Sequence, residues 1–223
     1  MIIQIYYFKM QQYFLKSYSQ LLTTYQHTIK KIKNSFDNYS YLCTNYFFMK
    51  KLSVIELDRV SKEEFKTIDK TPLVVVLDNI RSLNNVGSVF RSSDAFKLEK
   101  IYLCGVTATP PNAEIHKTAL GAEDSMEWEY EEDTKAVVAK LKQEGYKIFA
   151  VEQVQNSIML DRVELDKTNK YVLILGNEVK GVQQEVVDMC DFAVEIPQFG
   201  TKHSLNVSVA AGIVIWEFFK KLQ

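Results

Sequence analysis

The chain has 223 residues, of which 47% are hydrophobic and 25% are charged, and its formal net charge is −1. This length allows one α/β domain with a substantial core, and the composition excludes a mostly disordered or fibrous protein. A net charge so close to zero gives no general attraction to nucleic acid, so any surface that binds phosphates must be local.

The first 48 residues differ in composition from the rest of the chain. They contain no Gly, Ala, Val, Pro, Glu or Arg, yet they hold eight of the twelve tyrosines. Their apolar residues keep neither a sustained helical nor an alternating period. Three interpretations stay open: an RNA-contacting tail rich in Tyr and Lys, a targeting peptide, or translated sequence upstream of the natural start. We favour the third, because residues 49–223 have an ordinary globular composition and no signal-peptide pattern precedes Met49. Residues 1–48 are therefore expected to be an extension, disordered or upstream of the start.

From residue 49 onward, helix and strand patterns alternate. A first short helix is predicted over Val54–Ile68, and Thr71-Pro72 ends it. The predicted strands are short apolar runs at Leu73–Leu77, Lys100–Cys104, Tyr146–Val151, Tyr171–Leu175 and Phe192–Ile196. The further predicted helices are Val86–Phe96, Thr134–Glu144, Val182–Met189 and Leu205–Leu222. Short apolar strands separated by helices predict an α/β fold, with a largely parallel sheet that is covered by helices on both faces.

The cysteines and the longest apolar run bear on cellular setting. Cys43, Cys104 and Cys190 are far apart and odd in number, so they indicate neither a disulfide framework nor a zinc site. A reducing cytoplasm is the simplest setting for such thiols. The run Val207–Trp216 is about half of the ~20 residues that span a bilayer. It is typical of a core helix, and neither a membrane nor a metal is expected as a partner.

Three polar segments each follow a predicted strand and open a helix. In parallel sheets ligands bind beyond the carboxyl ends of the strands, where free helix N–H groups suit a polar cofactor. The chain has no dinucleotide glycine fingerprint, no Gly-Lys-Ser/Thr phosphate loop and no Gly-x-Ser-x-Gly elbow, so NAD enzymes, P-loop proteins and hydrolases are unsupported. The three segments are Asn84–Arg91, Gly176–Gly181 and Ile196–Asn206.

Taken in this order, the three segments resemble the three motifs of the SpoU (TrmH) family of SPOUT RNA methyltransferases. The resemblance covers roughly Pro72–Leu222 and includes the familial-looking stretch His116–Ala122. It implies a C-terminal trefoil knot, S-adenosylmethionine bound in a bent form by the knotted loops, and methylation of a ribose 2′-hydroxyl in structured RNA. Knots are so rare that no sequence period would predict one. The second motif departs from the commonest form, because Val179-Lys180 stands where a Gly is often found, which leaves the conformation of that loop open.

The resemblance also implies roles for single residues. Arg91 would activate the ribose hydroxyl, by lowering its pKa or by gripping an adjacent phosphate, because an arginine does not easily lose its own proton. Without the motif, Arg91 would be interpreted as a surface residue paired with Asp94. The cofactor would be held largely by backbone groups, at Gly176, Ile196 and Leu205.

Four more polar residues complete the predicted site or border it. The resemblance places Asn85 in the active-site wall, although an asparagine there could simply cap a helix. It gives Glu178 a role in ordering its own loop or its neighbours. Ser204 is a natural N-cap for the last helix, whereas Asn206 is less readily explained by stability alone. We therefore rank Arg91, Glu178 and Asn206 above Ser204.

Partners follow partly from the family and partly from pattern. Family members are generally homodimers that complete each active site across the interface, and small residues in the last helix permit close packing: Ser208, Ala210, Ala211 and Gly212. A local basic surface could come from Lys97, Lys117, Lys180 and Lys202. No separate RNA-binding domain is recognisable ahead of the catalytic one, which favours tRNA over rRNA. The alternatives are a noncatalytic RNA-binding relative and an unrelated nucleotide-binding α/β protein.

Overall fold

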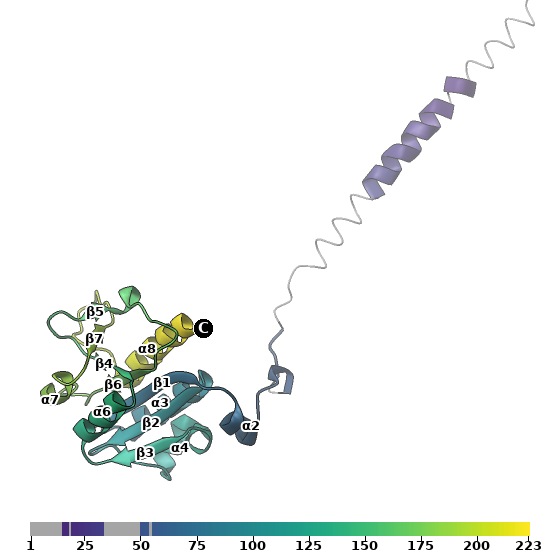
Figure 1. The fold of residues 1–223 in the computed structure, drawn as a ribbon. Helices are drawn as coiled ribbons and strands as arrows, with labels where there is room; N and C mark the ends of the chain where they lie inside the picture. The colour runs from purple at the N-terminus through teal and green to yellow at the C-terminus, as the bar shows by residue number, and fades with distance from the viewer. Residues whose placement is uncertain (1–14, 18, 34–49, 54) are drawn as a thin grey trace, which may run out of the picture. The chain divides into compact units, whose positions relative to one another are not determined.

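The computed structural model describes residues 15–17, 19–33, 50–53 and 55–223. The chain divides into two units, residues 1–59 and residues 60–223. In the first unit, residues 15–17 and 19–33 are helical (Figure 1). Their side chains are exposed. The sequence predicted no helix there, because the apolar residues lack a helical period. The expected start at Met49 and the rest of residues 1–48 lie outside the described residues.

The predicted helix over Val54–Ile68 is wrong. The chain instead forms a short 3-10 helix, η1 (Ile55–Leu57), and a separate α-helix, α2 (Lys62–Thr67). Asp58 ends the first turn with a left-handed backbone, φ 45°. Ser61 then starts α2 as its N-cap, since its hydroxyl accepts a hydrogen bond from the backbone N–H of Glu64 at 3.1 Å.

One parallel sheet forms the centre of the second unit. The described strands lie in the order β3-β2-β1-β6-β4-β7-β5, and every pair is parallel. The prediction of a largely parallel sheet is confirmed, and all five predicted strands are present. The strands β3 and β5 were not predicted, because β3 is a polar edge strand and β5 has two residues. The bounds are β1 Thr71–Asp78, β2 Leu98–Cys104, β3 Trp128–Glu131, β4 Lys147–Val151, β5 Ile158–Met159, β6 Tyr171–Leu175 and β7 Phe192–Glu195.

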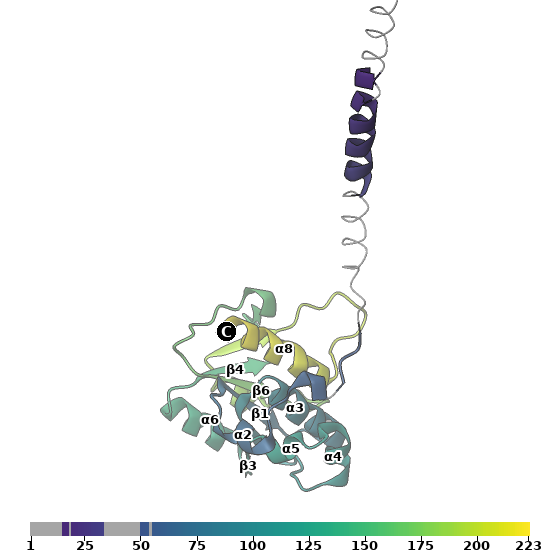
Figure 2. The same cartoon turned by 90° about the vertical axis from the view of Figure 1, so that its right-hand side faces the viewer.

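Helices cover both faces of this sheet, as predicted (Figures 1 and 2). Helices α3 (Leu83–Ala95), α4 (Ala113–Ala119), α5 (Ala122–Ser125) and α8 (Val207–Leu222) share one apolar core with alternate residues of β1. Helices α6 (Thr134–Gln143) and α7 (Gln184–Val187) pack on the other face. A short 3-10 helix, η2 (Leu160–Arg162), follows β5. Within the described ranges, every helix is too short or too polar for a membrane crossing.

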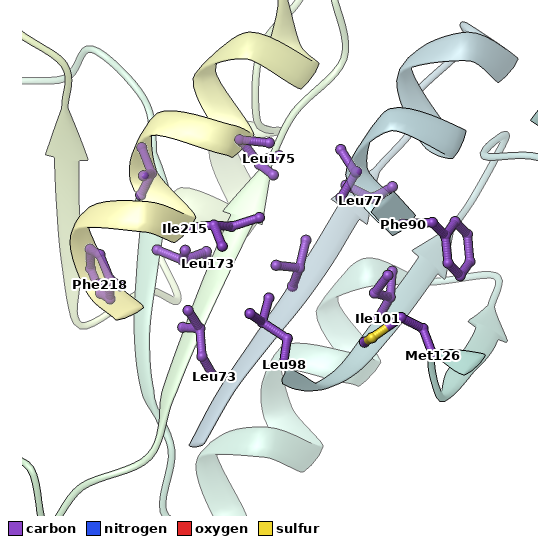
Figure 3. Packing of buried hydrophobic residues seen from close by; sticks show 14 of the residues in the cluster. Leu73, Leu77, Phe90, Leu98, Ile101, Met126, Leu173, Leu175, Ile215 and Phe218 are labelled. Carbon is purple, nitrogen blue, oxygen red and sulfur yellow. The ribbon is translucent and has the colours of Figure 1, made fainter. Parts of the chain in front are cut away.

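The larger core fixes α8 against the sheet. Figure 3 shows Ile215 and Phe218 of α8 beside Leu173 and Leu175 of β6, and all four side chains are buried. Burying a large apolar side chain fully stabilises a fold by about 1.5–3 kcal/mol. The start of α8 is therefore held at the carboxyl edge of the sheet, which is where the candidate site lies.

Gly87 allows α3 and α4 to cross closely, and this predicts a stability effect. A β-carbon at residue 87 would lie 2.2 Å from Thr118 Oγ1 and 2.3 Å from the backbone oxygen of Ile115. The carbonyl cannot rotate away, so one helix must shift. We expect Gly87→Ala to lower the free energy of unfolding by about 1–3 kcal/mol in urea titrations. Gly200→Ala, where no atom lies within 4 Å of the new carbon, is the matched control. Equal stability of the two variants would contradict this account of the crossing.

Candidate active site

The carboxyl ends of three neighbouring strands surround a cavity. From β1 the sheet continues to β2 and β3 on one side and to β6, β4, β7 and β5 on the other, so the topological switch lies between β1 and β6. The cavity beyond β6, β4 and β7 has a volume of about 460 Å³, which suits a small-molecule ligand. Its lining comes from residues 151–153, 175–181, 194–196, 198, 203–207 and 210.

All three residues that were predicted to bind a cofactor line this cavity. Gly176, Ile196 and Leu205 come from the end of β6, the end of β7 and the chain before α8. A β-carbon on Gly176 would lie 2.0 Å from the backbone nitrogen of Val182 and 2.1 Å from the carbonyl carbon of Gly181, so only glycine allows the loop to return this closely. No backbone N–H between residues 196 and 205 donates a hydrogen bond within the described part of the chain. These groups are free to bind a polar ligand.

Glu178 ties the loop after β6 to the start of α3. Its carboxylate accepts hydrogen bonds of 3.0 Å from the backbone N–H groups of Arg81 and Ser82, and a third of 3.0 Å from Nδ2 of Asn85. Ser82 is the N-cap of α3, so the carboxylate lies at the positive end of that helix. Partial burial would raise the pKa of Glu178, but the hydrogen bonds from Arg81 and Ser82 outweigh burial and hold its pKa below the ordinary value of 4.5.

The lowered pKa of Glu178 predicts how its contribution to stability depends on pH. A carboxylate with a lowered folded-state pKa stabilises the fold above its unfolded pKa, near 4.3, and this stabilisation is lost as the pH falls through the lower folded value. We expect wild type and Glu178→Gln to differ most in unfolding free energy above about pH 5, and the difference to shrink as the pH falls through the lowered folded-state pKa of Glu178. Urea titrations over this pH range measure the difference. A difference that is constant with pH would show that the charge of Glu178 is not responsible.

Asn85 and Asn206 complete a hydrogen-bonded chain through the three sequence segments. Nδ2 of Asn206 donates to Oδ1 of Asn85 at 3.1 Å, and Nδ2 of Asn85 donates to Glu178. Asn85 does not cap α3, because Ser82 holds the N-cap position and Asn85 is buried within the first turn. Asn206 and Asn85 are 121 residues apart in sequence, and Asn85 and Glu178 are 93 residues apart. The hydrogen bonds between these two amides and one carboxylate nevertheless join the three segments.

The predicted N-cap of the last helix is wrong. The helix α8 begins at Val207, and its N-cap is Asn206, whose Oδ1 accepts from the backbone N–H groups of Ser208 and Val209 at 2.9 and 3.4 Å. Asn206 therefore has a structural task as well as its contact with Asn85. Ser204 lies on the exposed chain before the helix and lines the cavity.

Arg91 stands apart from the other predicted site residues. It lies on the exposed side of α3 and does not line the cavity. It forms no ion pair within the described residues, and Asp94, its expected partner, instead accepts a hydrogen bond of 2.6 Å from Oγ of Ser125. The fold thus brings Asn85, Glu178 and Asn206 together, and it leaves Arg91 facing outward.

The four lysines of the predicted basic surface do not form one cluster at the cavity. Lys180 lines the cavity, and Lys202 is exposed in the loop after β7. Lys117 pairs with Glu114 at 2.5 Å on α4, and Lys97 is exposed at the turn before β2. No group of three His, Cys, Asp or Glu side chains that could hold a metal occurs in the described ranges.

Two polar residues that were not among the predicted site residues hold the loop after β6. Asp78 is fully buried at the end of β1, and its carboxylate accepts from the backbone N–H of Gln183 at 3.1 Å and from Oγ1 of Thr134 at 2.6 Å. Asn177 donates to the backbone oxygen of Asn79 at 2.7 Å. The sequence does contain a pattern that indicates Asp78, because this single acidic residue ends the apolar run of β1.

The part of the chain that contains the three segments matches a known protein family. Residues 72–216, more than half of the chain, match the model of the SpoU rRNA Methylase family. The chain is 34% identical over 148 residues to a tRNA (guanosine(18)-2′-O)-methyltransferase of Aquifex aeolicus, covering 65% of this chain and 67% of that protein. It is 32% identical to a 23S rRNA (guanosine-2′-O-)-methyltransferase of Nitrosomonas europaea, covering 67% of this chain and 56% of the relative. Several relatives are thus matched over less than two thirds of their length.

Solved structures show the same fold. The crystal structure of the A. aeolicus TrmH/SpoU tRNA modifying enzyme superposes with a TM-score of 0.63 at 28% identity, over 72% of this chain and 79% of that one. An AdoMet-bound rRNA methyltransferase from Sinorhizobium meliloti gives a TM-score of 0.64 at 25% identity, over 71% of this chain and 60% of that one. The α/β fold with its parallel sheet is therefore shared with these enzymes.

Proposed function

Because the chain belongs to the SpoU rRNA methylase family, we propose that it transfers a methyl group from S-adenosylmethionine to a ribose 2′-hydroxyl of RNA. One observation carries the proposal. The loops after β6 and β7 enclose one cavity, and Gly176, Ile196 and Leu205 all line it. The relatives named above are RNA 2′-O-methyltransferases, and one structural neighbour is described as AdoMet-bound.

The residues present fit this cofactor. The cavity is lined by apolar side chains, such as Leu175 and Val194, and by free backbone N–H groups of the loop 196–205. The absence of a side chain at Gly176 makes room for the close return of its loop. When bound, the cofactor supplies an electrophilic methyl group, and no metal is required for its transfer. The protein's part is to hold the ribose oxygen in line with that methyl group, and such positioning contributes several kcal/mol to catalysis.

We propose that the hydrogen bonds between Asn206, Asn85 and Glu178 support this arrangement. Asn206 donates to Asn85 and Asn85 donates to Glu178, so the start of α8, the first turn of α3 and the loop after β6 keep one relative position. Arg91 is assigned to the substrate, where its charge lowers the pKa of the ribose hydroxyl or binds the neighbouring phosphate. The released proton then goes to a group other than Arg91, for which a phosphate of the RNA is the candidate.

A homodimer accounts for the outward position of Arg91. The helices α3 and α8 are in contact near Gly212, where a β-carbon would be at an ordinary packing distance, 3.9 Å, from Oγ of Ser92, the residue after Arg91. The neighbouring surface of α8 exposes an apolar stripe at Val209, Ile213 and Trp216, with exposed fractions of 50%, 39% and 49%. An apolar stripe of this kind suits a second copy of the chain. Sedimentation equilibrium tests this part of the proposal, and a monomer mass at micromolar concentration would contradict it.

We also propose that the C-terminal part of the chain forms a trefoil knot. It is supported by the path of the chain, which leaves β6 through the loop 176–183, crosses to β7 beyond β4, and returns through 196–206 to α8 on β6 and β1. Both loops line the same cavity. Family membership gives the further support, since the expected knot belongs to the SPOUT fold.

We further propose tRNA as the substrate and the cytoplasm as the location. The tRNA proposal is supported by the relative from A. aeolicus, whose name specifies tRNA, while other relatives are named for 23S rRNA. The cytoplasmic proposal is supported by the cysteines that are described, Cys104 and Cys190, which are both free. Burial raises the pKa of each thiol to about 12, so neither is a reactive thiolate at neutral pH.

The test combines transfer with mapping of the product. Purified protein is incubated with tritiated S-adenosylmethionine and total RNA from a strain that lacks the gene, and 2′-O-methyl groups are located by nuclease digestion and mass spectrometry. Methyl incorporation at one ribose position is the expected result, and the fraction that carries it distinguishes tRNA from rRNA. Binding of cofactor and RNA without any transfer would favour a noncatalytic RNA-binding relative. Failure to bind S-adenosylhomocysteine would defeat the proposal.

A further inference from the structure

The strand β4 lies between the two strands whose loops enclose the cavity. The local order is β6-β4-β7, and the loops after β6 and β7 carry two of the sequence motifs. Glu152 and Gln153 follow β4 directly and also line the cavity. Neither residue belongs to a motif segment. Their position between the two loops lets one short piece of chain contact both.

Glu152 contacts the loop after β6. Its Oε2 accepts a hydrogen bond of 3.0 Å from the backbone N–H of Val182, and its own N–H donates to the backbone oxygen of Val194 in β7 at 3.1 Å. Gly181, before Val182, has φ +70°, and a β-carbon there would lie 2.2 Å from Oε2 of Glu152. A side chain at residue 181 would therefore displace this carboxylate and strain the backbone.

Gln153 contacts the other loop. Its Nε2 donates a hydrogen bond of 3.0 Å to the backbone oxygen of His203. The backbone N–H groups of residues 196–205 donate no hydrogen bond within the described part of the chain, so this contact holds a stretch with little other main-chain support. The backbone N–H of Gln153 donates to Oε1 of Glu152 at 2.9 Å, which couples the two residues.

We propose that Glu152 and Gln153 are positioning residues that clamp both cofactor loops in the shape that binds S-adenosylmethionine. This inference rests on the proposed function. Glu152 acts on the loop 176–183 through Val182, and Gln153 acts on the loop 196–206 through His203. The pair holds the cavity at the right width before ligand binds, which spares the cost of ordering two loops during binding.

The test measures binding of S-adenosylhomocysteine to the full chain by calorimetry, well below the unfolding temperature of each variant. Loss of a hydrogen bond to a charged group predicts that Glu152→Ala weakens binding about 10- to 100-fold. Loss of a neutral hydrogen bond predicts about 2- to 10-fold for Gln153→Leu, whose exposed position leaves folding intact. Glu152→Gln keeps an acceptor oxygen for Val182 and should recover part of the affinity. Gln155→Leu, an exposed glutamine in the same loop, is the matched control.

A kinetic measurement separates positioning from general stability. Both clamp variants should raise KM for S-adenosylmethionine by more than they lower kcat, and hydrogen exchange in residues 176–183, several of whose N–H groups are hydrogen-bonded, should speed up in Glu152→Ala. A lower melting temperature with unchanged affinity and KM would overturn the inference. If wild type binds S-adenosylhomocysteine and both variants bind it equally well, the inference alone is wrong. If wild type does not bind it, the proposed function fails and the inference with it.

Discussion

Gly176→Ala is expected to weaken binding of S-adenosylhomocysteine by roughly 5- to 150-fold, the equivalent of about 1–3 kcal/mol of overpacking strain. The added β-carbon would lie 2.0 Å from the backbone nitrogen of Val182 and 2.1 Å from the carbonyl carbon of Gly181. Both are main-chain atoms, so no side-chain rotation relieves the collision. The loop 176–181 must move away from β6, and with it move several groups that line the cavity. Calorimetry with wild type and variant measures the change.

The control for this variant is a glycine at the opposite edge of the sheet. Gly145 precedes β4 at its amino end and has φ +85°, and a β-carbon added there would have no atom within 4 Å. Gly145→Ala should therefore cost stability, because alanine disfavours this backbone, and leave ligand affinity within about twofold. If Gly176→Ala binds as tightly as Gly145→Ala, the loop after β6 does not hold the cofactor. A loss of affinity in both variants would indicate a general effect of reduced stability instead.

The strands were predictable because their burial is nearly complete. Leu73–Leu77 and Tyr171–Leu175 are continuous apolar runs, and a strand covered on both faces needs such a run. The strand β3 has the sequence Trp-Glu-Tyr-Glu at the edge of the sheet, so its alternating polar residues gave no such signal. The first helix was predicted as one element because periodicity alone does not report the left-handed turn at Asp58.

Which polar residues the fold brings together was predictable in part, but their contacts were not. The resemblance to the family motifs indicated Asn85, Glu178 and Asn206, and the fold joins them in one hydrogen-bonded chain. The partners depend on which strands are neighbours, and the pairing of β1 with β6 brings Glu178 to the backbone of Arg81, 97 residues away. The choice of N-cap for α8 shows the same limit. Ser204 and Asn206 are both good capping residues, and sequence does not report that Asn206 is held by Asn85 at the start of the helix.

Arg91 is the residue whose position in the single chain agrees least with the role that the motif implies. This difference makes its role testable. Its side chain is exposed on α3 and does not line the cavity, so it is not needed to hold the cofactor. A guanidinium stays charged at any pH near neutral, so Arg91 cannot serve as the base. The role that we propose for it is therefore electrostatic: to stabilise the developing oxyanion of the ribose, or to hold the phosphate beside it.

Arg91→Ala should therefore lower kcat for methyl transfer by about 10²- to 10³-fold, the usual cost of removing one group that stabilises developing charge. Affinity for S-adenosylhomocysteine should stay within about twofold of wild type, since the cavity is unchanged.

Arg91→Lys keeps the charge but loses the paired donors, so partial recovery would indicate charge and no recovery would indicate phosphate binding by the guanidinium fork. Arg162→Ala removes another exposed arginine, at the end of η2, and should leave kcat unaltered. Single-turnover assays with saturating RNA measure all four proteins. Full activity in Arg91→Ala would show that this residue takes no part in methyl transfer. Its side chain would then point outward in the active enzyme as well.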